Sequence, residues 1–445
     1  MQISENVTGR AEVPPRAPER QHPESWRHTQ QSAAAKGRAG TVTRVRAQSV
    51  SPDAPDVGHL LDLADPDVVA DPYAALAACR ATAPVGWHGP LGMYVATSHS
   101  ACNAVLRDRA LGRIFTGREP ADAWDTFNWL HADSILDSEP PKHTRLRHLI
   151  AGAFGRGHVH RLAPRIEELA EGLVADCAAT VSEEGAVDVI EALAEPLPVL
   201  VIAELLGVPE PDRHLLRPWS QAIVRMYEVT RTREEDEAAQ RACREFAAYV
   251  EALAADRARH PGEDLLSDLV AARDGTDRLS PQELVATAVL LLNAGHEASV
   301  NGFGNGLASL LTAGGDFGDP VRLVEEMLRH DSPLHLFERT ATHDTVIEGI
   351  HIRAGEKVAA LLGAANRDPA VFAEPDAFQP HRDPNPHLAF GAGIHFCVGA
   401  PLARLELATA AGVLLGRWPR LRVMDAVRRP TFVLRGYERL VIAPA

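Results

Sequence analysis

The sequence lacks the features of a membrane protein, a nucleic-acid-binding protein and a disulfide-stapled secreted domain. Its apolar runs, Pro198 to Val208 and Ala286 to Leu292, are too short to span a bilayer. Acidic residues outnumber basic ones, and the net charge of −15 argues against nucleic acid as a partner. The five cysteines are odd in number and scattered, as expected of reduced thiols in a cytoplasmic protein.

The first 50 residues differ in composition from the rest of the 445-residue chain. They contain eight basic and four acidic residues, which leaves a net charge of −19 on the remainder. They show no apolar core pattern, and Met1 to Arg46 has no continuous apolar stretch of the kind that a secretion signal needs. We therefore expect a disordered tail over residues 1–50 and a folded domain over residues 55–445.

Helical patterns dominate this domain, and strands are short and few. The spacing of apolar residues predicts helices over residues 162–177 and 198–206 and two surface helices between residues 217 and 258. Short strands are predicted over residues 93–97 and 358–362, and a terminal hairpin is expected from residues 431–434 and 439–442. The fold class is therefore mainly α with small β-sheets.

Cys397 lies in a glycine-rich loop directly before a helix. Gly391 and Gly393 allow the loop to curl tightly, and Pro401 suits the first turn of the helix that follows. Main-chain N–H groups and the positive end of the helix dipole would bias the sulfur towards thiolate. Thiolate is the form that an iron ligand requires.

Cys397 has two other interpretations. A lone cysteine is usually a small buried hydrophobe, and Cys397 beside His395 could form half of a zinc site. Zinc would need two more ligands at recognisable spacing, and the chain has no C-x-x-C or H-x-x-x-H pair. Iron ligation is therefore favoured.

The loop resembles the haem-binding signature of the cytochrome P-450 family at Phe390, Gly391, Gly393, His395, Cys397 and Gly399. The resemblance implies a single triangular haem-binding domain with a long central helix, and haem b (iron protoporphyrin IX) as the cofactor. Cys397 would be the axial iron ligand that favours O–O cleavage. Phe390 and Gly391 would lie beside the cofactor. Family-like motifs follow in order from about Asp71 to Ala445.

A long buried helix is predicted to begin after Ser280. Ser280 and Glu283 form a capping box, and the helix can continue to about Leu311, a length of about 45 Å. It is apolar on most sides through Leu292, which places it in the interior. An unpaired carboxylate at Glu297 inside such a helix is expensive and needs a reason to be there.

Residues 294–299, A-G-H-E-A-S, resemble the family's oxygen-activation segment. Ala294 and Gly295 remove side-chain bulk, which lets a flat ligand or O₂ approach the backbone. The resemblance makes Glu297 a member of a proton relay that normally includes a hydroxyl. The structural alternative is that Glu297 pairs with a basic residue in the interior.

The segment departs from the family pattern at Ala298, where the family usually has Thr. Ser299 is adjacent, but one step along a helix rotates a side chain by about 100°, so Ser299 is not a simple replacement. We hypothesise that a hydroxyl of the substrate, or a water held by Glu297, completes the proton path. The missing hydroxyl at this position also favours the alternative of oxidative coupling.

The resemblance assigns further residues to cofactor binding and to the scaffold. His143 and Arg147 lie one helical turn apart and would hold the haem propionates, with Arg339 and His395 as the third and fourth contacts. A solvated basic face is the other interpretation of the first pair. A buried structural network is expected from Glu326, Arg329 and Arg382, although Glu325 reaches Arg329 equally well on spacing alone.

Substrate contacts are expected from an aromatic stretch and from two later segments. The candidates are Trp124, Phe127, Trp129, Leu336, Phe432 and Val433. For each aromatic residue, a hydrophobic anchor under a loop is an equally good interpretation.

The sequence therefore predicts a haem-thiolate monooxygenase that hydroxylates or epoxidises a small organic substrate, expected to be a secondary metabolite, with O₂. Electrons would come from separate proteins, a ferredoxin and a ferredoxin reductase, and the enzyme is expected to be a monomer. One alternative is a haem-thiolate enzyme of oxidative coupling or desaturation. Another is a non-catalytic haem-binding or sensor protein, which would have no need for Glu297.

Overall fold

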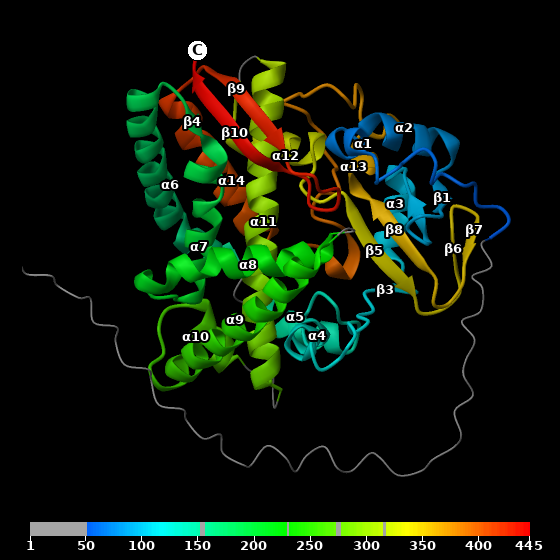
Figure 1. Cartoon of the computed structure of the whole chain (residues 1–445), viewed down its shortest axis with the longest axis horizontal. Helices are drawn as coiled ribbons and strands as arrows, with labels where there is room; N and C mark the ends of the chain where they lie inside the picture. The colour runs from blue at the N-terminus through cyan, green and yellow to red at the C-terminus, as the bar shows by residue number, and fades with distance from the viewer. Residues whose placement is uncertain (1–50, 152–155, 229–230, 273–276, 315–316) are drawn as a thin grey trace, which may run out of the picture. The chain divides into compact units, whose positions relative to one another are not determined.

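The structure is a computed structural model that describes residues 51–151, 156–228, 231–272, 277–314 and 317–445. The tail expected over residues 1–50 lies outside these ranges. The predicted class, mainly α with small β-sheets, is confirmed (Figure 1). Within the described ranges, every helix is too short or too polar to cross a membrane.

The helices form most of the described chain. They are α1 (Pro66–Ala70), α2 (Tyr73–Thr82), α3 (His99–Arg107), α4 (Asp125–Ala132), α5 (Lys142–Ala151), α6 (Arg156–Glu184), α7 (Pro196–Leu206), α8 (Leu216–Val224), α9 (Arg233–Arg259), α10 (Leu265–Ala271), α11 (Pro281–Ala313), α12 (Pro320–His330), α13 (Leu362–Ala365) and α14 (Ala400–Arg417). Short 3₁₀ or π turns are η2 (Ile190–Ala194), η3 (Glu210–Leu215), η4 (Arg225–Tyr227) and η5 (Gly393–His395).

Three small sheets accompany the helices. The largest has the order β1-β2-β8-β5-β3 and is built from β1 (Val85–His88), β2 (Met93–Ala96), β8 (Lys357–Leu361), β5 (Leu336–Ala341) and β3 (Leu111–Gly112). The second has the order β4-β10-β9, from β4 (Val187–Asp188), β10 (Tyr437–Pro444) and β9 (Leu421–Arg428). β6 (Thr345–Ile347) and β7 (Ile350–Ile352) form the third. Only β2 and β8 pair in parallel among the described strands.

The predicted long helix is α11, which runs through the middle of the helical part in Figure 1. Its capping box is present: the Ser280 hydroxyl accepts from the Glu283 N–H at 3.1 Å, and the Glu283 carboxylate accepts from the Ser280 N–H at 2.9 Å. α7, α8, α9, α12 and α14 all pack against α11. The helix therefore organises the main hydrophobic core.

The C-terminal hairpin is present, but the prediction of its first strand is wrong. The strand that pairs with β10 is β9, whereas residues 431–434 form the connection between the two strands. In that connection the Thr431 hydroxyl donates to the Leu434 carbonyl at 2.7 Å. β9 escaped prediction because most of its side chains are exposed, so it shows no alternation of apolar and polar residues.

Close packing of α11 on α12 gives a testable stability difference between two glycines. A Cβ at Gly306 would lie only 2.3 Å from Met327 Cβ, so Gly306→Ala would force the helices apart. We expect it to lower the free energy of unfolding by ~1–3 kcal/mol. Thermal unfolding of the purified protein measures the change.

Gly172 is the matched control, because it lies exposed inside α6 with no atom within 4 Å of a built Cβ. Gly172→Ala should stabilise the protein by ~0.4–1 kcal/mol through the unfolded chain. Equal melting temperatures for the two variants would contradict the packing argument.

Candidate active site

The Cys397 loop is curled as its glycines predict. Gly391 and Gly393 have φ of 69° and 73°, a left-handed region that favours glycine. A Cβ at Gly393 would also come within 2.5 Å of the Leu106 carbonyl oxygen. The Cys397 N–H donates to the Phe390 carbonyl at 3.0 Å, which closes the loop immediately before α14.

The acidity of the Cys397 thiol differs from the sequence-based expectation. Burial raises its pKa, and the main-chain groups of Gly399 and Ala400, together with Arg147, offset burial only in part. The free chain therefore does not bias the sulfur towards thiolate, because burial in a low-dielectric interior penalises the charged form more than the loop stabilises it.

One face of α11 remains accessible in the middle of an otherwise buried helix. Ala294 is exposed and Ala298, one turn later, is half-buried, whereas Glu297 and Ser299 are buried. The small side chains of Ala294 and Ala298 leave room beside the helix. Gly295 has a packing explanation of its own, because a Cβ there would lie 3.0 Å from Ile202 Cδ1 of α7.

Glu297 is paired with a basic residue, as the structural alternative held. Its Oε2 accepts from Arg429 Nη1 at 2.7 Å, and Arg429 Nη2 lies 3.1 Å from Glu195 Oε1. Glu195 pairs in turn with Arg217, whose side chain is 43% exposed. A chain of alternating charges therefore connects the buried carboxylate with the surface.

A second buried carboxyl, Glu406 of α14, was not singled out from the sequence. Burial alone raises its pKa to about 8, so the group is protonated at neutral pH. Glu406 and Ser299 line a small cavity of about 10 Å³, on the scale of a single water. The signal that could have found it is an acid between two leucines, Leu405 and Leu407, in an apolar helix.

Two predicted propionate contacts meet across the structure. The rings of His143, on α5, and His395 lie 4.4 Å apart, and His395 Nε2 lies 2.8 Å from Glu139 Oε1. Burial, with the nearby His395 and Arg147, lowers the pKa of His143 to about 4. His143 Nε2 is buried and has no hydrogen-bond partner within the described ranges.

Arg339, the third predicted contact, is buried without a counter-ion. It is 2% exposed, and its guanidinium lies 4.7 Å from the Phe337 ring. Its Nη1 donates to the Glu338 carbonyl at 3.0 Å, and among the described residues no carboxylate lies within 4.0 Å of the guanidinium. Burial, with the neighbouring Arg113, lowers its pKa to about 9.

Arg147, the partner of His143 on α5, faces the cysteine loop. Its Nη2 donates to the Phe396 carbonyl at 2.9 Å, one residue before Cys397. Four basic side chains from three separate segments therefore lie at or beside this loop: His143, Arg147, Arg339 and His395. Among the described residues, the carboxylate bonded to one of them is Glu139.

Comparisons with known proteins identify the family. A model described as Cytochrome P450 matches residues 322–429. The chain is 37% identical to the cytochrome P450 monooxygenase PikC of Streptomyces venezuelae, over 88% of this chain and 95% of that protein. The chain belongs to the cytochrome P450 family.

Further relatives agree with this assignment. The P450 is 41% identical to the mycinamicin IV hydroxylase/epoxidase of Micromonospora griseorubida, over 74% of this chain and 83% of that protein. The solved structure of the cytochrome P450 PksS of Bacillus subtilis 168 matches with a TM-score of 0.77 and 32% identity, over 86% and 99% of the two chains. The P450 is a haem-dependent monooxygenase, as predicted.

The residues of this P450 fit haem. Among the described residues, the buried Arg339 has no carboxylate within ion-pair distance and the buried His143 Nε2 has no hydrogen-bond partner, as expected where a ligand brings carboxylates. The accessible Ala294 leaves space beside α11 for a flat ring. Cys397 can supply the sulfur ligand, because the left-handed Gly391 and Gly393 and the Cys397 N–H bond to the Phe390 carbonyl hold its loop in place.

The predicted scaffold network is present in this P450. Arg329 Nε donates to Glu326 Oε2 at 2.7 Å, and Arg382 Nε lies 3.1 Å from the same oxygen. Glu325 does not join it and pairs instead with Arg404 and His387. The order E-x-x-R therefore selected the correct glutamate where spacing alone left two.

The predicted substrate contacts divide by burial. Trp124 and Phe127 are 5% and 3% exposed and pack under Arg118, as the anchor interpretation holds. Phe432 and Val433 are also buried, in the connection before β10. The two half-buried candidates, Trp129 and Leu336, retain accessible surface, so substrate contact stays a prediction for all six.

Proposed function

We propose that this P450 hydroxylates or epoxidises a small secondary metabolite. The observation that carries the proposal is the cysteine loop beside four basic side chains, of which His143 and Arg339 are buried, with Glu139 as the carboxylate bonded to them among the described residues. The mycinamicin hydroxylase/epoxidase among its relatives supports the reaction class. Product analysis after turnover with isotopically labelled O₂ tests it: one labelled oxygen atom in the product is expected, and an unlabelled coupled product would overturn it.

Haem, when bound, supplies oxygen activation. We propose that Cys397 ligates its iron and that His143, Arg147, Arg339 and His395 hold its propionates. Arg339 would do so most strongly, because it is buried and no carboxylate of the described residues lies within ion-pair distance of it.

Protons have to reach the site by another route than the family's usual hydroxyl, because Ala298 carries none. We propose two sources: a substrate hydroxyl, and a route through Ser299 and Glu406. The Glu406 carboxyl is protonated at neutral pH and shares a water-sized cavity with Ser299. Glu297 is held by Arg429 and would act by ordering water near the site.

Replacing Glu406 by Gln should uncouple the enzyme. The amide keeps the shape but holds no exchangeable acid, so product formed per reductant consumed should fall by about tenfold, less than the ~10²–10⁴ of a direct acid because water partly substitutes. Ser299→Ala should have a similar effect. Measuring product, peroxide and reductant together checks both.

Ser309→Ala is the matched control, because that serine lies on the same helix and bonds His330 outside the site. Its coupling should equal the wild type. Undiminished coupling in both Glu406→Gln and Ser299→Ala would rule out this route. Undiminished coupling with substrate analogues lacking each hydroxyl would rule out the substrate-assisted source.

We further propose a ferredoxin and its reductase as electron donors, a monomeric state and a cytoplasmic location. The free thiols of the five described cysteines support the last. Reduction by a ferredoxin system and the mass in solution test the first two. A rate independent of added ferredoxin would exclude that donor.

A further inference from the structure

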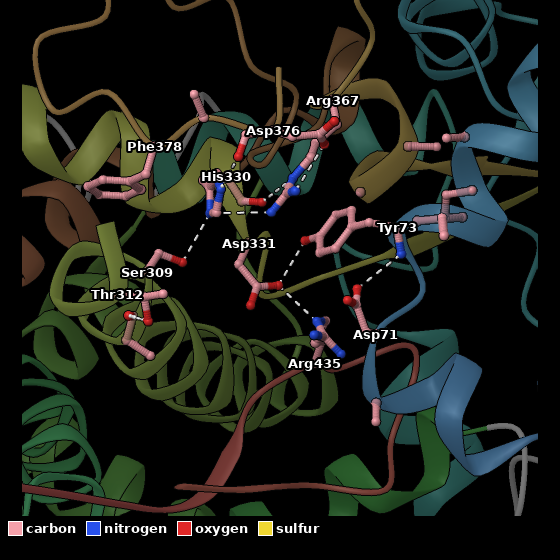
Figure 2. Close-up of a pocket in the computed structure, with 18 of the residues that line it drawn as sticks. Asp71, Tyr73, Ser309, Thr312, His330, Asp331, Arg367, Asp376, Phe378 and Arg435 are labelled. Atoms are coloured by element: carbon pink, nitrogen blue, oxygen red, sulfur yellow. Dashed lines mark hydrogen bonds and ion pairs between the residues drawn. The ribbon is translucent and has the colours of Figure 1, made fainter. Parts of the chain in front are cut away.

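A cavity of about 800 Å³ lies on the other side of the C-terminal half of α11 and belongs to no site described above. α2, α11, α12 and the connection before β10 contribute its walls (Figure 2). None of the predicted haem or substrate residues lines it.

Arginines dominate the charged part of the wall. Arg80, Arg367, Arg428 and Arg435 all line the cavity, and their side chains are only 5–23% exposed. The buried carboxylate facing them is Asp331. Asp71 and Asp376 also line it: Asp71 is exposed, and Asp376, whose side chain is 78% exposed, pairs with Arg367 at 3.1 Å.

Asp331 neutralises only part of this positive charge, because two of the four arginines share it. Its oxygens accept from Tyr73 Oη at 2.8 Å, from Arg435 Nε at 2.8 Å and from Arg428 Nη2 at 2.7 Å, as Figure 2 shows for the first two. Two guanidinium groups and a phenol therefore share one carboxylate. His330, with its pKa lowered to about 4 by burial and nearby Arg367, adds neither charge nor competition at neutral pH.

Several guanidinium N–H groups remain available. Arg428 Nε, Arg435 Nη2 and Arg80 Nη2 find no hydrogen-bond acceptor among the described residues, while Arg80 Nη1 donates to the Ala364 carbonyl at 2.8 Å. The nearest carboxylate to Arg80 is Asp368 at 3.9 Å. Such forks match carboxylate and phosphate oxygens.

The rest of the wall is mostly small and apolar, apart from the hydroxyls of Ser309 and Thr312, which bond to His330 and to the Ala308 carbonyl. Ala70, Ala74, Ala77, Ala308 and Ala313 line it together with the ring of Phe378. The chain as a whole has a net charge of −15, so a partly enclosed cluster of arginines is unusual on it. Arginines beside small apolar side chains favour anions that also carry an apolar organic group. We propose that this cavity is a second ligand site for a small organic anion, either a carboxylate or a phosphate monoester.

Two alanines of α2 provide a matched pair of variants. Ala77 is exposed and lines the cavity one turn before Arg80, whereas the neighbouring Ala78 is exposed and does not line it. Ala77→Glu places a carboxylate inside the cavity, where it pairs with arginine and repels an anion. Ala78→Glu adds the same charge outside.

Isothermal titration of the haem-loaded enzyme with phenyl phosphate, benzoate, inorganic phosphate and benzyl alcohol tests the proposal. Phenyl phosphate or benzoate should bind at least tenfold more tightly than benzyl alcohol, and which of the two binds more tightly identifies the anionic group. Ala77→Glu should weaken that binding at least tenfold, and Ala78→Glu should leave it within twofold.

Three results would overturn the proposal. Equal affinity of Ala77→Glu and Ala78→Glu for the anion would show that the anion binds elsewhere. Equal affinity for inorganic phosphate and phenyl phosphate would show that the organic group is not recognised. A haem absorption change that persists in Ala77→Glu would assign the probe to the haem pocket. Unchanged thermal unfolding of both variants establishes that each is folded.

Discussion

Cys397→Ala is expected to abolish monooxygenase activity while leaving the protein folded and able to hold haem. The basic cradle of His143, Arg147 and Arg339 is independent of the sulfur, so the variant should still retain the cofactor. Without a thiolate the iron loses the ligand that favours O–O cleavage, and turnover should fall by about 10³-fold or more, equivalent to ~4 kcal/mol. The reduced, carbon-monoxide-bound spectrum should lose the long-wavelength Soret band typical of thiolate ligation.

Cys243→Ala is the control for this experiment. Cys243 is fully buried in α9, and burial raises its pKa to about 12, so it is an inert thiol in the core. Its removal should leave both spectrum and turnover unchanged, with a small loss of stability from the missing atom. A thiolate-type Soret band that survives in Cys397→Ala and disappears in Cys243→Ala would overturn the ligand assignment.

The elements that the sequence predicted well are those with strong local rules. Ser280 and Glu283 specify a helix start, and an apolar run specifies burial, so α11 was placed to within two residues at its end. The cysteine loop was recognisable because positive φ at Gly391 and Gly393 demands glycine. In each case, the chemistry of a few neighbouring residues determines the conformation.

The partners of the buried charges could not be predicted, because they come from distant segments. Arg429 lies 132 residues from Glu297, and β9, the strand directly before it, has no apolar alternation to locate it. Glu139, which bonds His395 across 256 residues, had no local signal either. Long-range pairing depends on the packing of whole elements, which spacing along the chain does not encode.

The second large effect is expected from replacing Glu326, a member of the buried scaffold network with Arg329 and Arg382. Glu326 and Arg329 are both 0% exposed, and the carboxylate also accepts from Arg382 and from the Gln379 N–H at 2.8 Å. Removing one partner of a buried ion pair leaves uncompensated charge and typically costs ~3–5 kcal/mol. Glu326→Gln should therefore lower the melting temperature by about 3–6 °C in a domain of this size.

Glu325→Gln separates the buried network from general charge loss. Glu325 is the next residue on α12 and pairs with Arg404 and His387, but its side chain is 25% exposed, so its replacement should cost only ~1 kcal/mol. Thermal unfolding of the two variants measures this difference in stability, and gel filtration measures the haem that each retains.

Haem loss is expected first in Glu326→Gln. Arg382 bonds to Glu326 and lies fifteen residues before Cys397 in the chain, so losing this bond should loosen the segment that carries the cysteine. Those molecules that keep haem should still show the thiolate-type spectrum, because the network holds the ligand's backbone and contributes nothing to the iron itself. Equal melting temperatures for the two variants would show that the buried network does not hold this scaffold together.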